Sequence, residues 1–159
     1  MRVVECVPNI SDGRRPEVYG AVARAAGAVP GVTVLDVDPG AETNRTVITF
    51  VGEPEAVLEG AFQLMVAALA RIDMSAHQGA HSRLGAVDVV PFVPVSGVTM
   101  AECVELARRL GERVGRELGI PVYLYENAAA SAARRNLADI RAGEYEGLAA
   151  KLADPAWKP

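Results

Sequence analysis

The sequence of 159 residues contains few lysines and cysteines, and these shortages narrow the possible functions. Only Lys151 and Lys158 are lysines and the net charge is −4, so we expect no basic surface for a nucleic-acid partner. The two cysteines, Cys6 and Cys103, fall in a strand pattern and a helix pattern, which is typical of buried free thiols. No run is apolar enough to span a membrane, and the first residues lack the apolar core of a signal peptide. We therefore expect a cytoplasmic protein with no membrane partner.

The composition is that of a globular protein. Half of the residues are apolar and 23% are charged, which distinguishes the chain from a disordered one. A chain of 159 residues is long enough to bury a substantial core. We expect one domain over residues 1–159.

Hydrophobic periodicity and turn residues predict the order of the secondary-structure elements. The predicted elements are strand 2–7, helix 16–28, strand 32–37, strand 45–51, helix 54–73 and strand 86–95. The second and third strands are expected to form a hairpin. The order strand, helix, strand, strand, helix, strand predicts an α+β, ferredoxin-like βαββαβ sandwich, with both helices on one face of an antiparallel sheet.

The second half of the chain extends this arrangement by a further helix and strand. Thr99 and Glu102 have the spacing of a capping box, which predicts a helix from there to Gly119. The residues PVYLY at 121–125 predict a fifth strand, and residues 137–142 a short helix; the tail ADPAWKP is expected to be a loop. Pro91 and Pro94 interrupt the fourth strand, which indicates an edge or bulged position.

Both histidines, His77 and His81, lie in a turn of small and polar residues between the second helix and the fourth strand. An imidazole in such a turn is suited to proton transfer, so His81 is a candidate general acid or base. A solvated or locally hydrogen-bonded histidine is the other interpretation. The spacing of four would suit a metal pair on a helix, but Gly79 disfavours a helix and no further histidine or clustered cysteine completes a site. We expect no metal.

Several polar residues follow or precede strands where they can share a rim with this turn. Asp38 ends the second strand and can orient an imidazole, although an aspartate before Pro-Gly is also an ordinary turn residue. Asn44 and Arg45 open the third strand, and Arg83 lies beside the histidines; each arginine can hold a substrate carboxylate or be simply solvated. Asn9, at the end of the first strand, is a neighbour if the first and third strands pair.

Longer blocks of the sequence resemble a known family. The blocks are VECVPNISDGRRPEV, LDVDPGAETNRTVITFVGEPEAV, IDMSAHQGAHSRLGAVDVVPFVPVSGVTMAECVELARRLGERVGRELGIPVYLYENAA and NLADIRAGEYEGL. They resemble the N-terminal subdomain of glutamate formiminotransferase from Met1 to about Trp157. The motifs TNRTV-x-TFVG and DV-x-PF-x-PV-x-GVTM are specific to that family.

The resemblance implies transfer of the formimino group from N-formimino-L-glutamate to N5 of tetrahydrofolate, in histidine degradation and one-carbon metabolism. Tetrahydrofolate would be a co-substrate, and no metal or redox cofactor would be needed. The family's catalytic histidine falls on His81 and its carboxylate partner on Asp38. Asn9, Asn44 and Arg45 match other motif positions near the site.

Two features depart from the family pattern. The family usually has HPRMG where this chain has HSRLG from His81 to Gly85, and loss of that proline loosens the backbone. Family enzymes also continue past Trp157 into a folate-contacting segment and a C-terminal subdomain, with the substrates between the two subdomains. We therefore expect a half-enzyme, a split partner or a fragment. Its partners would be a C-terminal subdomain or second-half chain, or a second copy in a homodimer. The alternative is a non-catalytic folate-binding or assembly module that retains the fold.

Overall fold

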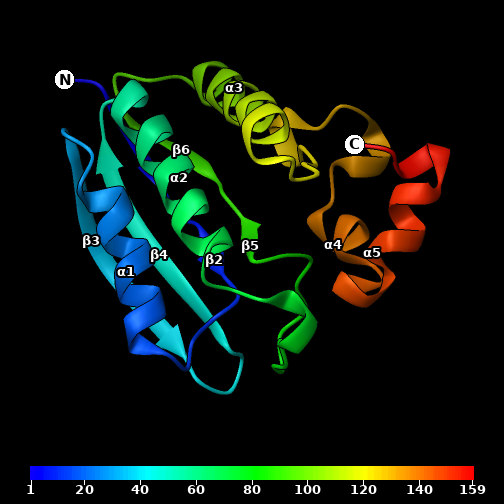
Figure 1. The fold of residues 1–159 in the computed structure, drawn as a ribbon. Helices are drawn as coiled ribbons and strands as arrows, with labels where there is room; N and C mark the ends of the chain where they lie inside the picture. Colours follow the sequence, from blue (N-terminus) through cyan, green and yellow to red (C-terminus); the bar gives the residue numbers. More distant parts are fainter.

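The computed structural model describes residues 1–159, which form one antiparallel sheet covered on one face by helices (Figure 1). The strands are β1 (Val3–Cys6), β2 (Asn9–Ile10), β3 (Val32–Gly40), β4 (Arg45–Gly52), β5 (Val87–Val89) and β6 (Phe92–Ser96). β3 and β4 form the predicted hairpin, and the other edge of β4 pairs with β1 and β2. β6 and β5 lie beyond β1 and β2 respectively.

Prolines divide two continuous strands into these shorter pieces. β1 and β2 pair with β4 in a single register, Cys6 opposite Phe50 and Asn9 opposite Val47. Pro8 lies at the break because it has no N–H to donate, although its carbonyl still accepts from the Ile48 amide at 2.9 Å. Pro91 divides β5 from β6 in the same way at the edge of the sheet. When β1 is joined with β2 and β5 with β6, the sheet has four strands in the order β3, β4, β1/β2, β6/β5. This is the ferredoxin-like order, and the predicted fold class is confirmed.

Three long helices cover one face of this sheet: α1 (Pro16–Gly27), α2 (Pro54–Leu69) and α3 (Met100–Leu118) (Figure 1). α1 and α2 each begin with proline at the first turn, where no intrahelical N–H is lost. α3 has the predicted capping box, with the Thr99 hydroxyl accepting from the amide of Glu102, and it ends at Gly119 with φ of 65°. None of the helices is both long and apolar enough to cross a membrane.

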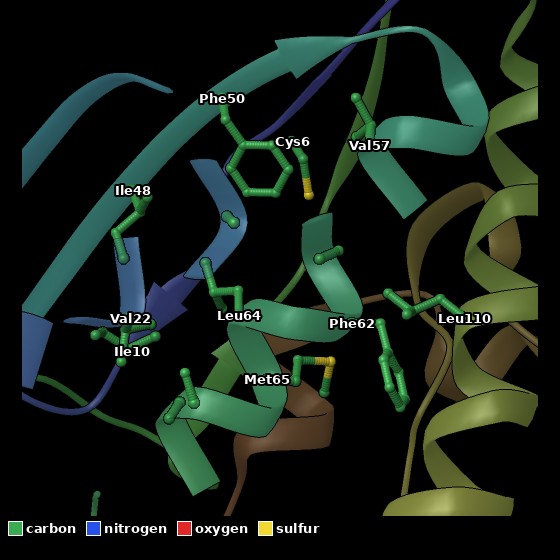
Figure 2. Close-up of a cluster of buried hydrophobic side chains, with 14 of the residues drawn as sticks. Cys6, Ile10, Val22, Ile48, Phe50, Val57, Phe62, Leu64, Met65 and Leu110 are labelled. Carbon is green, nitrogen blue, oxygen red and sulfur yellow. The ribbon is translucent and has the colours of Figure 1, made fainter. Parts of the chain in front are cut away.

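The core lies between the sheet and these helices. Ile48 and Phe50 of β4 are fully buried against Leu64 of α2 (Figure 2). Arg45 and Val47 alternate with the buried residues of β4, so they point to the other face of the sheet. That second face is only half-buried or exposed, and no helix of the chain lies across it (Figure 1). This second face is the uncovered face of the sheet.

The segment after α3 differs from the sequence predictions. The predicted fifth strand at residues 121–125 is absent, because this segment does not pair with the edge of the sheet. Its side chains Val122 and Leu124 instead approach Gly111 of α3. α4 (Leu137–Arg141) matches the predicted short helix. α5 (Glu144–Ala153) was not predicted, and Pro155–Trp157 in the expected loop is a single 3₁₀ turn.

Candidate functional site

Three loops meet at one end of the sheet: residues 11–15 after β2, the β3–β4 turn at 41–44, and the histidine loop at 73–86 (Figure 1). Asn44 joins them. Its Oδ1 accepts from the Gly13 amide at 3.0 Å, and its Nδ2 donates to the Gln78 carbonyl at 2.9 Å. Asn44 has a φ of 50°, a conformation that asparagine tolerates better than most residues. The Ser11 hydroxyl adds a 2.7 Å hydrogen bond to the Gly85 carbonyl.

His77 has both ring nitrogens engaged in this junction. Nε2 lies 2.9 Å from the Asn44 carbonyl, which only accepts, and Nδ1 lies 2.9 Å from Nε of Arg83, which only donates. These contacts together specify the neutral tautomer with the proton on Nε2. His77 therefore has a structural role in holding the loop, and no ring nitrogen is left for a substrate.

Arg83 is buried, and the N–H groups of its guanidinium make hydrogen bonds within the chain. Nε contacts His77, and Nη1 and Nη2 donate to Glu146 of α5 at 2.9 and 2.8 Å. Glu144 is also within 3.4 Å of Nη1. The role predicted for Arg83, holding a substrate carboxylate, stays a prediction and would require some of these contacts to break. Here Arg83 attaches the histidine loop to α5.

The imidazole of His81 has one engaged and one open nitrogen. Nδ1 lies 2.6 Å from the carbonyl of Ser82 and 2.8 Å from Nη1 of Arg45. The carbonyl only accepts and the guanidinium only donates, so one neutral tautomer cannot hydrogen-bond to both. Nε2 has no partner in the chain. When Nδ1 donates to Ser82, the lone pair is on Nε2, where it can take a proton from a ligand.

Arg45, from the start of β4, connects this imidazole to the sheet. Its Nε donates to Oδ1 of Asn9 at 2.8 Å, and its Nη1 contacts Oδ2 of Asp88 at 3.1 Å. Burial lowers the pKa of Arg45, while the Asp88 carboxylate opposes that shift, and the guanidinium remains charged. Nη2 has no hydrogen-bond partner in the chain. The structure thus brings the side chains of His81, Arg45 and Asn9 together, while the Asn44 side chain contacts Gly13 and Gln78 in the neighbouring loops.

Asp38 lies on the uncovered face but makes no hydrogen bond with the imidazole. It is exposed on β3 opposite Val47, which is in turn opposite Asn9 on β2. Residues paired across antiparallel strands point to the same side, so the Asp38 and Asn9 side chains share the face. The role of Asp38 as partner of His81 stays a prediction.

Asp88 of β5 was missed by the sequence reasoning. Its side chain is 1% exposed, and it accepts from the Leu84 amide at 2.6 Å as well as from Arg45 and, on α4, Arg141. A charged residue within the apolar run AVDVVPF was the available signal, because a buried carboxylate requires compensating partners.

Asp88 and Arg141 also line a largely apolar cavity of about 380 Å³ between β5, α3 and the segment after α3. No group of three or more His, Cys, Asp or Glu residues is placed to hold a metal ion.

The attachment of α5 to the histidine loop is expected to weaken in acid. The hydrogen bond from Arg83 lowers the pKa of Glu146 from 4.5 to about 2. A depressed carboxylate pKa stabilises the folded state above the unfolded value, and this contribution is lost as the pH falls from about 4.5 to about 2. We expect the free energy of unfolding to fall more steeply over this window in the wild type than in Glu146→Gln, as measured by urea denaturation. Parallel pH profiles for the two proteins would contradict the ion pair.

The fold and these contacts define an α+β domain with an open imidazole and a partly free arginine at one end of an uncovered sheet face. Residues 3–159 match the family described as "Formiminotransferase domain, N-terminal subdomain", and the chain belongs to that family.

Named relatives align along the whole chain. It is 46% identical over 158 residues to a glutamate formimidoyltransferase of Streptococcus pyogenes serotype M1, covering 99% of this chain and 53% of the relative. A protein of the same name from Thermoplasma acidophilum is 47% identical over 161 residues, with 100% and 53% covered. The formimidoyltransferase-cyclodeaminase of Gallus gallus is 56% identical over 158 residues, with 99% and 29% covered. The chain therefore spans about half of the first two relatives and under a third of the last.

Proposed function

We propose that this chain forms the N-terminal half of a glutamate formimidoyltransferase site, which transfers the formimino group from N-formimino-L-glutamate to N5 of tetrahydrofolate. The observation that carries the proposal is the open Nε2 of His81 beside the partner-free Nη2 of Arg45, in a chain of this family. The first group moves protons and the second binds a carboxylate. Asn9 holds the arginine in place.

The reaction requires two proton transfers that one imidazole can perform in turn. N5 attacks the amidine carbon and gives up its proton to Nε2 of His81. The bond from that carbon to the glutamate nitrogen then breaks, and the imidazolium returns the proton to this leaving nitrogen. The Ser82 carbonyl holds Nδ1–H throughout, so that Nε2 is the nitrogen that exchanges protons.

Substrate positioning supplies much of the expected acceleration. Nη2 of Arg45 is placed to bind a glutamate carboxylate, because Nε and Nη1 are already engaged by Asn9, His81 and Asp88. Asp38 lies on the same uncovered face and would stabilise or orient positive groups there. Holding the formimino donor and the folate acceptor together converts a bimolecular reaction into an effectively unimolecular one.

The uncovered face is the surface on which we propose that a C-terminal subdomain packs, enclosing the substrates. Val93 and Val95 of β6 are 39% and 58% exposed. Exposed apolar residues of this kind favour association, so the 159-residue chain by itself would form a homodimer. A cytoplasmic location is part of the same proposal.

A transferase assay of the chain, alone and with a C-terminal subdomain supplied as a second polypeptide, tests the proposal. We expect little turnover and weak folate binding alone, because a small ligand needs most of its surface buried, and restored turnover with the second half. Formimino-glutamate and formyl-glutamate are compared as donors, and light scattering gives the assembly state. Folate binding without turnover in the assembled protein would favour the non-catalytic module. A fully active monomer would contradict the half-site.

A further inference from the structure

We propose that Arg83 is a positioning residue, which together with Glu146 of α5 clamps the loop that carries His81. This inference rests on the proposed function and deepens it, because it makes α5 part of the site. Arg83 has no hydrogen bond to His81 or Arg45, so it acts through the loop rather than on the substrate. The Arg83 clamp is the set of contacts that this guanidinium makes with His77 and α5.

One side of the clamp closes the segment 77–83, in which His81 lies. Nε of Arg83 donates to Nδ1 of the His77 ring at 2.9 Å, and Nη2 donates to the His77 carbonyl at 3.3 Å. The two ends of the segment are therefore joined by one side chain. Joining the ends of a short loop reduces the number of conformations open to the residues between them.

The other side of the clamp binds two glutamates at the start of α5. Nη1 and Nη2 of Arg83 donate to the two carboxylate oxygens of Glu146 at 2.9 and 2.8 Å, a bidentate pair, and Nη1 also donates to Oε1 of Glu144 at 3.4 Å. With the two contacts to His77, every N–H group of the guanidinium has an acceptor. No donor is left for a substrate carboxylate while the clamp is intact, in contrast to Arg45.

The backbone at the start of α5 has an unusual conformation that serves these contacts. Gly143 and Glu144 have φ of 87° and 53°, and a positive φ is uncommon for glutamate. The Tyr145 amide donates to the Arg83 carbonyl at 3.1 Å, and the Arg83 amide donates to Oε1 of Glu144 at 3.3 Å. A backbone conformation of this kind persists only where its surroundings hold it, and here it lies against the histidine loop.

The glutamates keep the guanidinium at this position. The Arg83 side chain is 8% exposed, whereas those of Glu144 and Glu146 are 44% and 67% exposed. A buried charge is costly without a counter-charge, so removal of Glu146 would favour a position of the guanidinium nearer to water. The contacts of Arg83 with His77 would then weaken.

His81 lies between two supported parts of the histidine loop. The Ala80 amide donates to the Glu42 carbonyl of the β3–β4 turn at 3.2 Å, which holds the part before His81. The Arg83 clamp holds the part after it. Without the clamp, residues 81–83 would lose this support, and Nε2 of His81 would spend less time where it can exchange a proton with a bound ligand.

Backbone ¹⁵N relaxation of the 159-residue chain tests the clamp without requiring activity. In Glu146→Ala we expect lower order parameters at residues 81–83 and unchanged values in β4. Because α5 has no buried residue, this variant should keep the fold. Glu146→Gln keeps one acceptor oxygen and should give intermediate values. Arg83→Lys places its donors on one nitrogen, which cannot reach both His77 and the glutamates, and should loosen the same residues.

Glu55→Ala is the matched control for Glu146→Ala. Glu55 accepts from both Nη atoms of Arg109 at 2.7 and 2.8 Å, an equally bidentate pair, and it lies at the opposite end of α2 from the histidine loop. Its loss should change neither kcat nor the order parameters at residues 81–83. Wild-type order parameters at these residues in Glu146→Ala, or an equal fall in Glu55→Ala, would overturn the proposal.

Steady-state kinetics with the C-terminal subdomain supply a second readout. A positioning role predicts that Arg83→Lys and Glu146→Ala lower kcat on the order of tenfold with little change in KM for the donor. A raised KM with unchanged kcat in Arg83→Lys would instead assign Arg83 to substrate binding and overturn the positioning role. An assembled wild type without transfer would reject the proposed function, while the relaxation data still decide the clamp. An active wild type with unchanged kcat in both variants would reject the positioning role alone.

Discussion

Replacing His81 with alanine is expected to lower the turnover of the assembled enzyme on the order of a hundredfold or more while leaving the fold intact. The imidazole is the only side chain of the cluster with an open nitrogen that is able to accept and return a proton. Its loss removes no core contact, because His81 is only half-buried and lies outside the buried cluster. Steady-state kinetics and circular dichroism of the same variant measure the two effects.

His77→Ala is the matched control for that variant. His77 uses both ring nitrogens to hold Asn44 and Arg83, so its loss should reduce stability more than His81→Ala does, and turnover much less. Near-normal turnover in His81→Ala would contradict the assignment of the base. Equal losses of turnover at both positions would instead indicate a shared function, such as a metal site.

Gly13→Ala is expected to destabilise the protein by roughly 3 kcal/mol, with loss of the site as the main structural consequence. A Cβ at residue 13 would lie 2.2 Å from the Gly40 carbonyl oxygen and 2.7 Å from the amide nitrogen of Arg45. These are backbone atoms of β3 and β4, so no flexible side chain can move away. The loop at 11–15 would have to withdraw, breaking the hydrogen bond from Gly13 to Asn44.

Gly147→Ala provides the opposite case within the same chain. Gly147 lies within α5, and a Cβ there would meet no atom within 4 Å. The exchange should stabilise the protein by roughly 0.5–1 kcal/mol, since glycine is the costlier residue inside a helix. Urea denaturation of both variants measures the difference, and a Gly13→Ala protein as stable as the wild type would show that the loops are not closely packed.

The sequence predicts the sheet and its covering helices because each carries its own periodic pattern. The β4 residues alternate between the core and the uncovered face, and α3 carries its own cap. Residues 121–125 have a strand-like pattern, but a segment becomes a strand only when it pairs with the edge of a sheet. Whether an edge is within reach depends on the rest of the fold and cannot be read from the segment itself. α5 is half-exposed and without a buried residue, so its apolar signal is weak; ion pairs to Arg83 attach it instead.

The site was partly predictable for a related reason. Asn9, Asn44, Arg45 and His81 lie at strand ends or in the histidine loop, where polar residues are conspicuous. The contact of Ser82 is made by its backbone carbonyl, which has no sequence signature. Arg141 follows Arg45 in chain order by almost a hundred residues, and only the folded structure brings both to Asp88.

The two buried thiols can report which part of the fold opens to solvent. Cys6 is fully buried in the sheet and Cys103 is 2% exposed on α3, and burial raises the pKa of both thiols. Each thiol reacts with a disulfide reagent only when its surroundings open, because the reactive thiolate forms readily only in water. Separation of α3 from the sheet releases Cys103, whereas Cys6 of β1 faces the core and stays covered as long as α2 remains packed on the sheet (Figure 2). The ratio of their labelling rates therefore distinguishes peeling of one helix from unfolding of the whole domain, without any engineered probe.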